Sequence, residues 1–386
     1  GIISEMVKLP EFISYLKLRT SYTEVGSPIT QTGITPGTVT DPMSGGVINP
    51  ISTYPYPDFK PERTKSYEVG INARFLNGRI SFDGTFYQSN TYNQTFLSVM
   101  SPATGYSGFY VQAGNVRNRG VEMTLGYNDT FGKVNYSTHL TYTANQNKIV
   151  EMVHDYRNPI DNSLVNITEL TLKEAGDVYL REGYSMSDVF TTGILQRGRD
   201  GKLVEEGNGY QVDRSQRIRL GSADPDFTMG WRHDINYKNI SLGLMITGRF
   251  GGIVTSQTQA FMDAFGVSKV SAEARDNGGV MLDGHRYDAE RYYNTVGGQG
   301  LMSYYTYDAT NVRLQELSLT YSLPKKWLGD VFNNATISFV GRNLFMFYRK
   351  APFDPDMNGS TGTYNRSDFF MAPSLRNLGF SIKFSL

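Results

Sequence analysis

The chain has 386 residues, and its 37 Lys and Arg residues are balanced by 37 Asp and Glu residues, so the formal net charge is zero. A neutral chain has no electrostatic reason to seek nucleic acid. The absence of cysteine excludes disulfides, thiolate metal ligands and thiol nucleophiles. No stretch approaches 18 consecutive apolar residues, which excludes a transmembrane helix. The 26 Tyr, 22 Phe and 40 Gly residues favour strands and turns.

The first clear hairpin follows a strand predicted at 16–22. Residues 66–75 place apolar side chains at odd positions and polar ones at even positions. Residues 76–79 then predict a tight turn, because Asn-Gly tolerates positive φ. Phe75 and Ile80 are symmetric about this turn, so the apolar faces of the two strands coincide.

The same alternation recurs along the chain and predicts further strands at 121–127, 134–142, 227–237, 240–249, 317–321, 337–339 and 378–386. The apolar rows carry no Lys, Arg, Asp or Glu, and His233 is the one ionisable residue among them. A charge on a lipid-facing strand position costs about 2–4 kcal/mol at the bilayer midplane. Rows of side chains that face lipid are therefore expected to lack charged residues. A soluble antiparallel sheet also has an uncharged core face, so the alternation leaves both interpretations open.

The lengths of the connections between the predicted strands favour a membrane barrel over a soluble sheet. The turns after Phe75, Tyr127 and Tyr237 have two to four residues, and the one after Tyr321 is somewhat longer. Between these hairpins lie five long connections: 23–64, 91–117, 144–225, 251–309 and 346–371. Structureless loops longer than about 12–15 residues are uncommon in compact domains. Short turns at one end and long loops at the other are typical of outer-membrane barrels. Aromatic residues near the strand ends would form the interfacial girdles: Tyr22, Tyr67, Tyr127, Tyr142, Tyr237 and Tyr321.

Strand parity limits the number of crossings. Residues 144–225 join two outer strand ends, so this connection contains either no crossing or two. We interpret 183–195, which is partly strand-like, as structure within an extracellular loop. About ten crossings remain, and their open edges must pair with further strands because a bilayer does not tolerate unpaired backbone.

Four motifs carry a family resemblance: KPERTKSYEVGINARFLNGRISF (60–82), NVRNRGVEM (115–123), DATNVRLQELSLTYSLPKKW (308–327) and GRNLFMFYRKAPFDPD (341–356). In order and spacing they resemble the C-terminal barrel region of the SusC/RagA family of TonB-linked outer-membrane proteins. The first two motifs are widespread in TonB-dependent receptors, and the last two are more specific to SusC-like proteins. The resemblance covers nearly the whole chain.

The resemblance implies an all-β fold, an antiparallel transmembrane β-barrel of 22 strands with an N-terminal plug domain and a TonB box. Residues 1–386 are then expected to be the C-terminal part, roughly ten strands with long extracellular loops, without the plug and the first strands. The implied function is TonB-energised import of nutrient oligomers, glycans or oligopeptides, with no covalent reaction. The implied partners are a SusD-like surface lipoprotein lid, the TonB complex and outer-membrane lipid, and pairs of the two proteins could form a dimer. The implied location is the outer membrane of a Bacteroidetes-type envelope.

The sequence predicts no catalytic residue and no cofactor. The four histidines are scattered, none lies in an HExxH pair, and no phosphate-binding glycine loop is present. The stretch 210–227 departs from the acidic pattern that members of the family often carry at this point, so no metal site is predicted.

Two sets of residues are candidates for contact with substrate or lumen. Aromatic residues of the connection 251–309 could stack on a sugar or pack against a peptide: Tyr292, Tyr293, Tyr304 and Tyr305. The alternative for these tyrosines is packing within the loop or against a lid. Arginines on the polar rows could bind an anionic solute or the plug: Arg74, Arg232, Arg249 and Arg342. The alternative for these arginines is pairing with charges of the barrel wall.

Two other classes of protein stay open. One is a self-contained ten-stranded barrel that acts as a passive porin or as an outer-membrane enzyme. The other is a soluble β-rich binding module, in which the apolar rows would lie in a core and the arginines outside. The rows of strands 240–249 and 378–386 distinguish these possibilities, because a transporter needs them against hydrocarbon.

Overall fold

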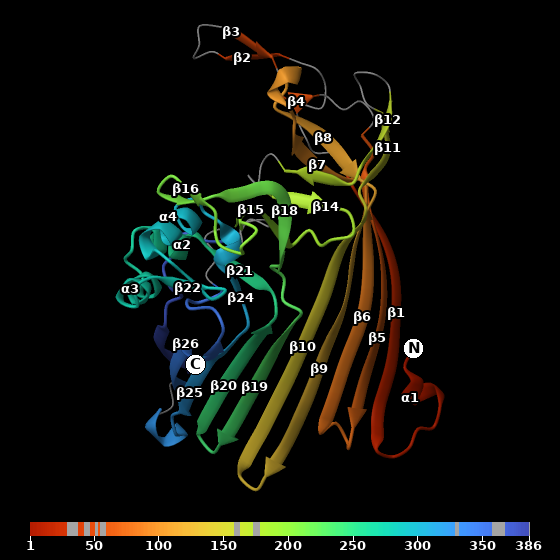
Figure 1. Cartoon of the computed structure of the whole chain (residues 1–386). Helices are drawn as coiled ribbons and strands as arrows, with labels where there is room; N and C mark the ends of the chain where they lie inside the picture. Colours follow the sequence, from red (N-terminus) through yellow and green to blue (C-terminus); the bar gives the residue numbers. More distant parts are fainter. Residues whose placement is uncertain are drawn as a thin grey trace. The chain divides into compact units, whose positions relative to one another are not determined.

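The computed structural model describes residues 1–28, 38–41, 47–50, 53–54, 59–157, 163–172, 178–328, 332–356 and 367–385. The chain divides into two compact units, the first formed by 1–131 and 135–187, the second by 132–134 and 188–386. Each unit contains five long strands of antiparallel sheet (Figure 1). The described residues therefore contain ten long strands, which agrees with the predicted number of crossings.

The five long strands of the first unit are neighbours in chain order: β1 (Ile13–Ser27), β5 (Glu62–Phe75), β6 (Ile80–Tyr92), β9 (Asn115–Phe131) and β10 (Val134–Glu151). The predicted pairing of Phe75 with Ile80 is confirmed. The turn between them places Asn77 and Gly78 at positive φ, as the Asn-Gly pair allows. Leu76 also has positive φ, at 51°, which the sequence does not indicate.

The shorter elements of the first unit precede β1 or lie in the long connections that join or follow the long strands. They are α1 (Ile3–Met6), β2 (Thr38–Asp41), β3 (Val47–Pro50), β4 (Thr53–Tyr54), β7 (Gln94–Val99), a 3-10 turn (Pro102–Thr104), β8 (Gly108–Ala113), β11 (Val153–Arg157), β12 (Leu164–Ile167), β13 (Glu169–Thr171) and β14 (Tyr179–Arg181). The strands among them form small sheets of two or three strands, separate from the long ones.

The second unit has the long strands β19 (Phe227–Tyr237), β20 (Ile240–Phe250), β25 (Asn311–Ser322), β26 (Asn334–Arg349) and β28 (Asn377–Ser385), again neighbours in chain order. The apolar rows are in register, with Leu244 opposite Leu317 and Phe339 opposite Phe380. The predicted last residue of the final strand, Leu386, lies outside the described residues.

The shorter strands of the second unit are β15 (Asp188–Leu195), β16 (Glu205–Glu206), β17 (Gly209–Tyr210), β18 (Val212–Ser222), β21 (Ile253–Ser256), β22 (Val280–Leu282), β23 (His285–Tyr287), β24 (Thr306–Asp308) and β27 (Ser367–Asp368). Strand β15 pairs with β18 in a sheet of its own. This confirms the interpretation of 183–195 as loop structure, since it adds no crossing to the long strands.

The connection 251–309, called here the helical connection, is folded, so its prediction as a structureless loop was wrong. It contains α2 (Gln257–Ala264), α3 (Lys269–Asp276), α4 (Ala289–Val296) and a 3-10 turn (Met302–Tyr304). Outside this connection, another 3-10 turn, Lys325–Trp327, follows β25. Each of the helices α2, α3 and α4 begins after a residue whose side chain caps it, respectively Ser256, Ser268 and Asp288. Two-residue alternation in a sequence does not indicate such caps or a helical spacing of apolar residues.

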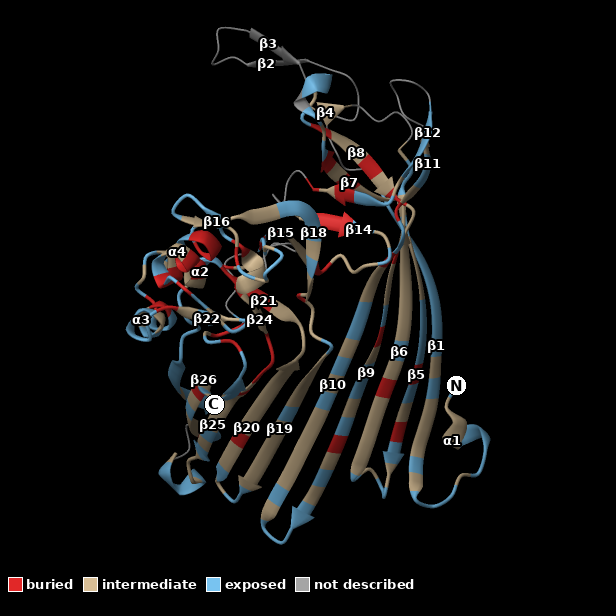
Figure 2. Cartoon of the chain, in the orientation of Figure 1, coloured by how far each residue is buried: buried red, intermediate tan, exposed pale blue. Residues whose placement is uncertain are grey.

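The apolar rows of the long strands are exposed, and the buried residues lie mostly in the connections (Figure 2). Phe380 and Ile382 are 68% and 48% exposed, and Leu242 and Leu244 are half-buried. Other exposed members of these rows are Leu18, Tyr67, Val69, Phe86, Met123, Leu125, Trp231, Ile240, Leu319 and Phe339. Hydrophobic rows of this extent need an apolar environment, and the pattern is opposite to that of a soluble sheet. No helix within the described residues is long and apolar enough to cross a membrane.

Candidate functional site

The charged rows lie on the face of the long strands opposite the apolar rows. In the first unit Arg19 Nη2 lies 2.7 Å from Asp83 Oδ1, and Asn72 donates a 2.7 Å hydrogen bond to the same carboxylate. The Arg19 and Asp83 side chains remain 41% and 38% exposed. This face is therefore polar and open to water in the part of the chain that the structure describes.

A shallow groove of about 650 Å³ crosses this polar face. Its lining combines carboxylates, hydroxyls and bare backbone: Arg19, Thr20, Ser21, Glu68, Gly70, Thr85, Tyr87 and Glu122. Next to it, the backbone of Gly120 approaches the carbonyl oxygen of Ala144 and the hydroxyl of Tyr87 so closely that a Cβ would collide with both. Glycine at this position therefore allows Tyr87 and the backbone of β10 to approach β9 closely.

Each of the four predicted lumen arginines contacts a group of its own unit. Arg232 pairs with Asp234 at 2.8 Å and approaches Glu316 at 3.8 Å, and Arg342 lies 3.1 Å from the same glutamate. Arg249 donates to the carbonyl oxygen of Ala223 and lies 3.6 Å from Asp356, and Arg74 stacks over Tyr15 with 5.5 Å between guanidinium carbon and ring centroid. Binding of a solute by these arginines stays a prediction.

The four predicted tyrosines of the helical connection pack around a common core. Tyr292 and Tyr293 are 8% exposed and Tyr305 is 2% exposed. The Tyr304 hydroxyl accepts a 3.2 Å hydrogen bond from the backbone of Leu195. Burial raises the pKa of Tyr292, Tyr293 and Tyr305, so these phenols stay neutral. The packing matches the alternative that the sequence left open, and contact with substrate stays a prediction.

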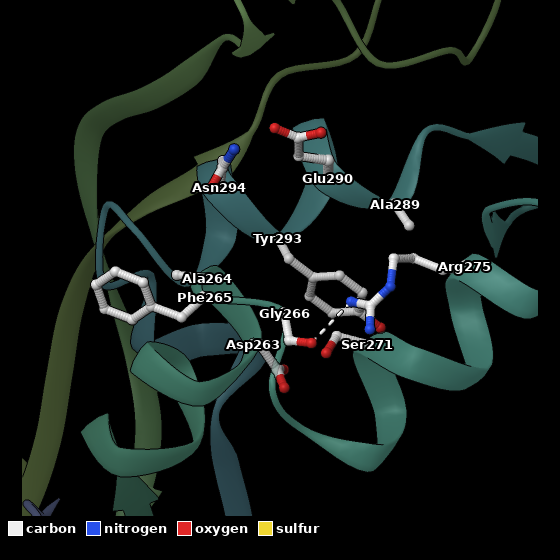
Figure 3. A pocket seen from close by; sticks show the side chains of 10 residues that line it. All are labelled: Asp263, Ala264, Phe265, Gly266, Ser271, Arg275, Ala289, Glu290, Tyr293 and Asn294. Atoms are coloured by element: carbon white, nitrogen blue, oxygen red, sulfur yellow. Dashed lines mark hydrogen bonds between the residues drawn. The ribbon is translucent and has the colours of Figure 1, made fainter.

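One of these rings faces a pocket. Tyr293 lines a cavity of about 280 Å³ between α2, α3 and α4, together with Asp263, Phe265, Arg275 and Glu290 (Figure 3). Arg275 Nη1 donates a 2.8 Å hydrogen bond to the carbonyl oxygen of Gly266 at its edge. Among the described residues, no group of His, Asp and Glu side chains could hold a metal ion.

Sequence reasoning missed a buried arginine at the end of β25. The Arg313 side chain is only 7% exposed, and its Nη2 lies 2.8 Å from Asp354 and 2.7 Å from Asp356. The predicted strand began at residue 317, so Arg313 was not counted with the charged rows. The available signal was that Arg313 lies in the family motif 308–327, and that the next family motif, 341–356, ends in Asp-Pro-Asp.

An exposed aromatic cluster lies on the same unit. The rings of Phe261, Phe369 and Phe370 are 5.2–6.2 Å apart and are 39%, 53% and 61% exposed. Two contacts hold the segment that carries the last two rings: a buried 2.7 Å hydrogen bond from Ser256 to Asp368, and one of 2.6 Å from the backbone of Phe370 to Thr258. We call these three residues the aromatic cluster.

Long antiparallel strands with one uncharged, exposed face and one charged face define the chain as part of a transmembrane β-barrel. Residues 10–247 match the family model for the TonB dependent receptor-like β-barrel. The chain belongs to this family of outer-membrane proteins, which confirms the resemblance that its motifs carry.

Known proteins agree with this assignment. The TonB-dependent receptors P3 and P26 of Formosa agariphila are each 25% identical to the chain, over 96% and 78% of its length. The structure of the RagAB peptide transporter superposes with a TM-score of 0.73 at 18% identity over 99% of the chain, and the open-open state of the RagAB peptide importer with 0.69. The chain spans 40% of P3 and 42% of the RagAB chain. These structures share its fold.

Proposed function

We propose that the chain is the C-terminal barrel portion of a TonB-energised importer of nutrient oligomers, glycans or oligopeptides, in a Bacteroidetes-type outer membrane. The observation that carries the proposal is the separation of uncharged and charged rows onto opposite faces of the long strands. Such a wall suits a barrel that encloses water and moves polar cargo without covalent chemistry. No catalytic residue is needed for this function.

The polar face is the proposed site of contact with a plug domain. In the proposed protein, the open groove beside Glu68 and Glu122 faces the plug domain, and TonB acts through that domain. Deleting the TonB box from the full-length protein tests this part. Uptake of labelled oligosaccharides or oligopeptides by cells should stop, while binding of the cargo at the cell surface continues. Continued uptake would favour the passive porin that remains the alternative.

A surface lipoprotein lid is the proposed partner. The aromatic cluster supports this, because three exposed phenylalanines on segments outside the long strands suit burial against another protein. We expect a triple substitution of Phe261, Phe369 and Phe370 by serine to reduce copurification of the lid with the full-length barrel at least tenfold. Met281, which is 56% exposed on β22, provides the control, and Met281→Ser should leave copurification unchanged. Undiminished copurification of the triple variant would contradict the role of the cluster.

The proposed cargo belongs to one of two classes, oligopeptides or glycans. The RagAB structures are of a peptide transporter, which makes oligopeptides one candidate. SusC-like motifs are equally compatible with glycans. A structure of the full-length complex with its copurified ligand distinguishes the two, and the same preparation tests whether two barrel–lid pairs form a dimer.

A further inference from the structure

The two motifs at 308–327 and 341–356 meet in space at one end of β25 and β26. Lys350 Nζ lies 2.6 Å from Asp308, and Arg313 pairs with Asp354 and Asp356 at 2.8 and 2.7 Å. Arg249 of β20 joins them, 3.6 Å from Asp356. We call these six residues the motif cluster. Its members come from segments that are far apart in the sequence, and most of them belong to the two motifs.

The composition of the motif cluster indicates a structural clamp. Three cations face three carboxylates, so the formal charges cancel and no excess charge is left to attract an ion. Arg313 and Asp354 are 7% and 8% exposed, and Arg313 receives further support from Asn311 and Asn343. A guanidinium buried with two carboxylates holds its partners in a defined geometry.

The motif cluster holds both ends of the connection between β26 and β28. Asp354, at the start of this connection, accepts a hydrogen bond from the hydroxyl of Ser374, near its end. Asn343 of β26 donates to Ser374 at 2.8 Å and to the carbonyl oxygen of Leu375 at 3.3 Å. Neither end can leave the long strands without breaking contacts to this cluster.

The same connection is attached to the helical connection. Its strand β27 pairs in parallel with β21, Thr255 with Ser367 and Ser256 with Asp368. The hydroxyl of the buried Ser256 donates a 2.7 Å hydrogen bond to Asp368. A continuous series of contacts therefore runs from Arg313 through the β26–β28 connection to the start of α2.

We propose that Arg313 is a positioning residue that fixes the helical connection relative to the long strands β25 and β26. It acts through Asp354 and Asp356, which clamp the β26–β28 connection, and through β27, which carries that constraint to β21. The aromatic cluster lies on the two connected segments, so the clamp also sets its position. This role is independent of the cargo and goes beyond the proposed import function.

Distance measurements between spin labels in the full-length protein test the proposal. The present chain has no cysteine, so labels at Phe265→Cys in the helical connection and Phe339→Cys on β26 are specific once any cysteine elsewhere is replaced. Both side chains are exposed, at 77% and 47%. We expect a narrow distance distribution in the parent, and at least a twofold broader one with Arg313→Met.

Arg342→Met is the matched control, because Arg342 lies on β26 and, within the described residues, its side chain pairs with Glu316 of β25. It should leave the distribution narrow, and Arg313→Lys, which keeps the charge without the two-pronged geometry, should give an intermediate width. Trypsin offers a second measurement, since the bond after Lys350 precedes the buried Ala351. We expect cleavage there to be at least fivefold faster with Arg313→Met.

If Arg313→Met does not assemble, Asp356→Asn replaces it, because Asp356 is 37% exposed and its loss is milder. Assembly is checked by the heat-dependent mobility of the folded barrel in gel electrophoresis. A distance distribution and a cleavage rate that match those of the Arg342→Met control would overturn the proposal.

Discussion

Arg313 and Asp354 are 41 residues apart in the sequence, yet their side chains meet at 2.8 Å with both almost fully buried. Asp356 shares the same guanidinium at 2.7 Å. The relationship connects the end of a long strand to the segment that follows the next strand. It therefore contributes to how the connections are held at the mouth of the proposed barrel.

Removing the buried Arg313 cation should lower the free energy of unfolding more than removing one partner of an exposed ion pair. Arg313→Met leaves the buried Asp354 carboxylate without its cation, and breaking a buried ion pair in this way costs about 3–5 kcal/mol. Arg63, whose pair with Glu24 is exposed at 61% and 37%, provides the contrast, and Arg63→Met should cost less than about 1 kcal/mol. Urea unfolding of the protein in lipid vesicles measures both, and equal midpoints for the two variants would contradict the assignment.

The contribution of Asp354 should depend on pH. Burial alone would raise its pKa, but hydrogen bonds from Arg313 and Ser374 lower it below the ordinary carboxyl value. The stabilisation is therefore complete above about pH 4 and is lost as the pH falls through the lower pKa of the folded state. Unfolding midpoints of the parent and of Asp354→Asn should differ at pH 7 and converge below pH 4. A constant difference over this range would show that the carboxylate charge is not responsible.

The two faces of β9 should respond in opposite ways to the same substitution. Met123, 41% exposed, lies on the apolar row, and Thr124 lies on the opposite face. Met123→Arg should destabilise the protein by about 2–4 kcal/mol in a bilayer, because the charge meets hydrocarbon. Thr124→Arg should change the stability by less than about 1 kcal/mol, since the charge stays in water. If the second variant proved the more damaging, the assignment of the faces would be reversed.

Gly120 should not tolerate a side chain. A Cβ there meets the Ala144 carbonyl and the Tyr87 hydroxyl, and relief requires the backbone of β10 to move, so Gly120→Ala should destabilise by about 1–3 kcal/mol. A Cβ at Gly379 meets nothing closer than 3.6 Å, so Gly379→Ala is the control and should be close to neutral. The heat stability of the folded barrel on gels compares the two. Equal loss in both would point to backbone entropy in place of the close approach.

The long strands were predictable because alternation in a strand is a local property. Each apolar row needs only its own residues and a bilayer to be recognised, and the short turns fix the register, as at Phe75 and Ile80. The charged rows were predictable from the same alternation, because they occupy the remaining positions of each strand. For Arg232 and Arg342 the sequence left two alternatives, contact with a solute or the plug and pairing with charges of the barrel wall. Their pairing with Glu316 was not decided by the sequence, because Glu316 lies on a different strand from either arginine.

Arg313 shows where the alternation fails. Counting back from Leu317 and Leu319 by twos would place Arg313 on the apolar row. In the pairing with β20, Glu316 lies opposite Met245 and Leu314 opposite Ile246, so a register shift adds one residue to β25 and moves Arg313 to the side of Arg249 and Asp356. Such a bulge is decided by both neighbouring strands together.

By itself, the sequence determined the class of the protein, the number of long strands and which rows of side chains meet lipid, because these depend on local periodicity and on the cost of charge in hydrocarbon. The tertiary structure decided that the helical connection is folded, that its tyrosines form a core, and that Arg313 joins two distant motifs. These features depend on contacts between residues far apart in the chain, which gain their energy only when several segments are brought together and water is excluded from between them.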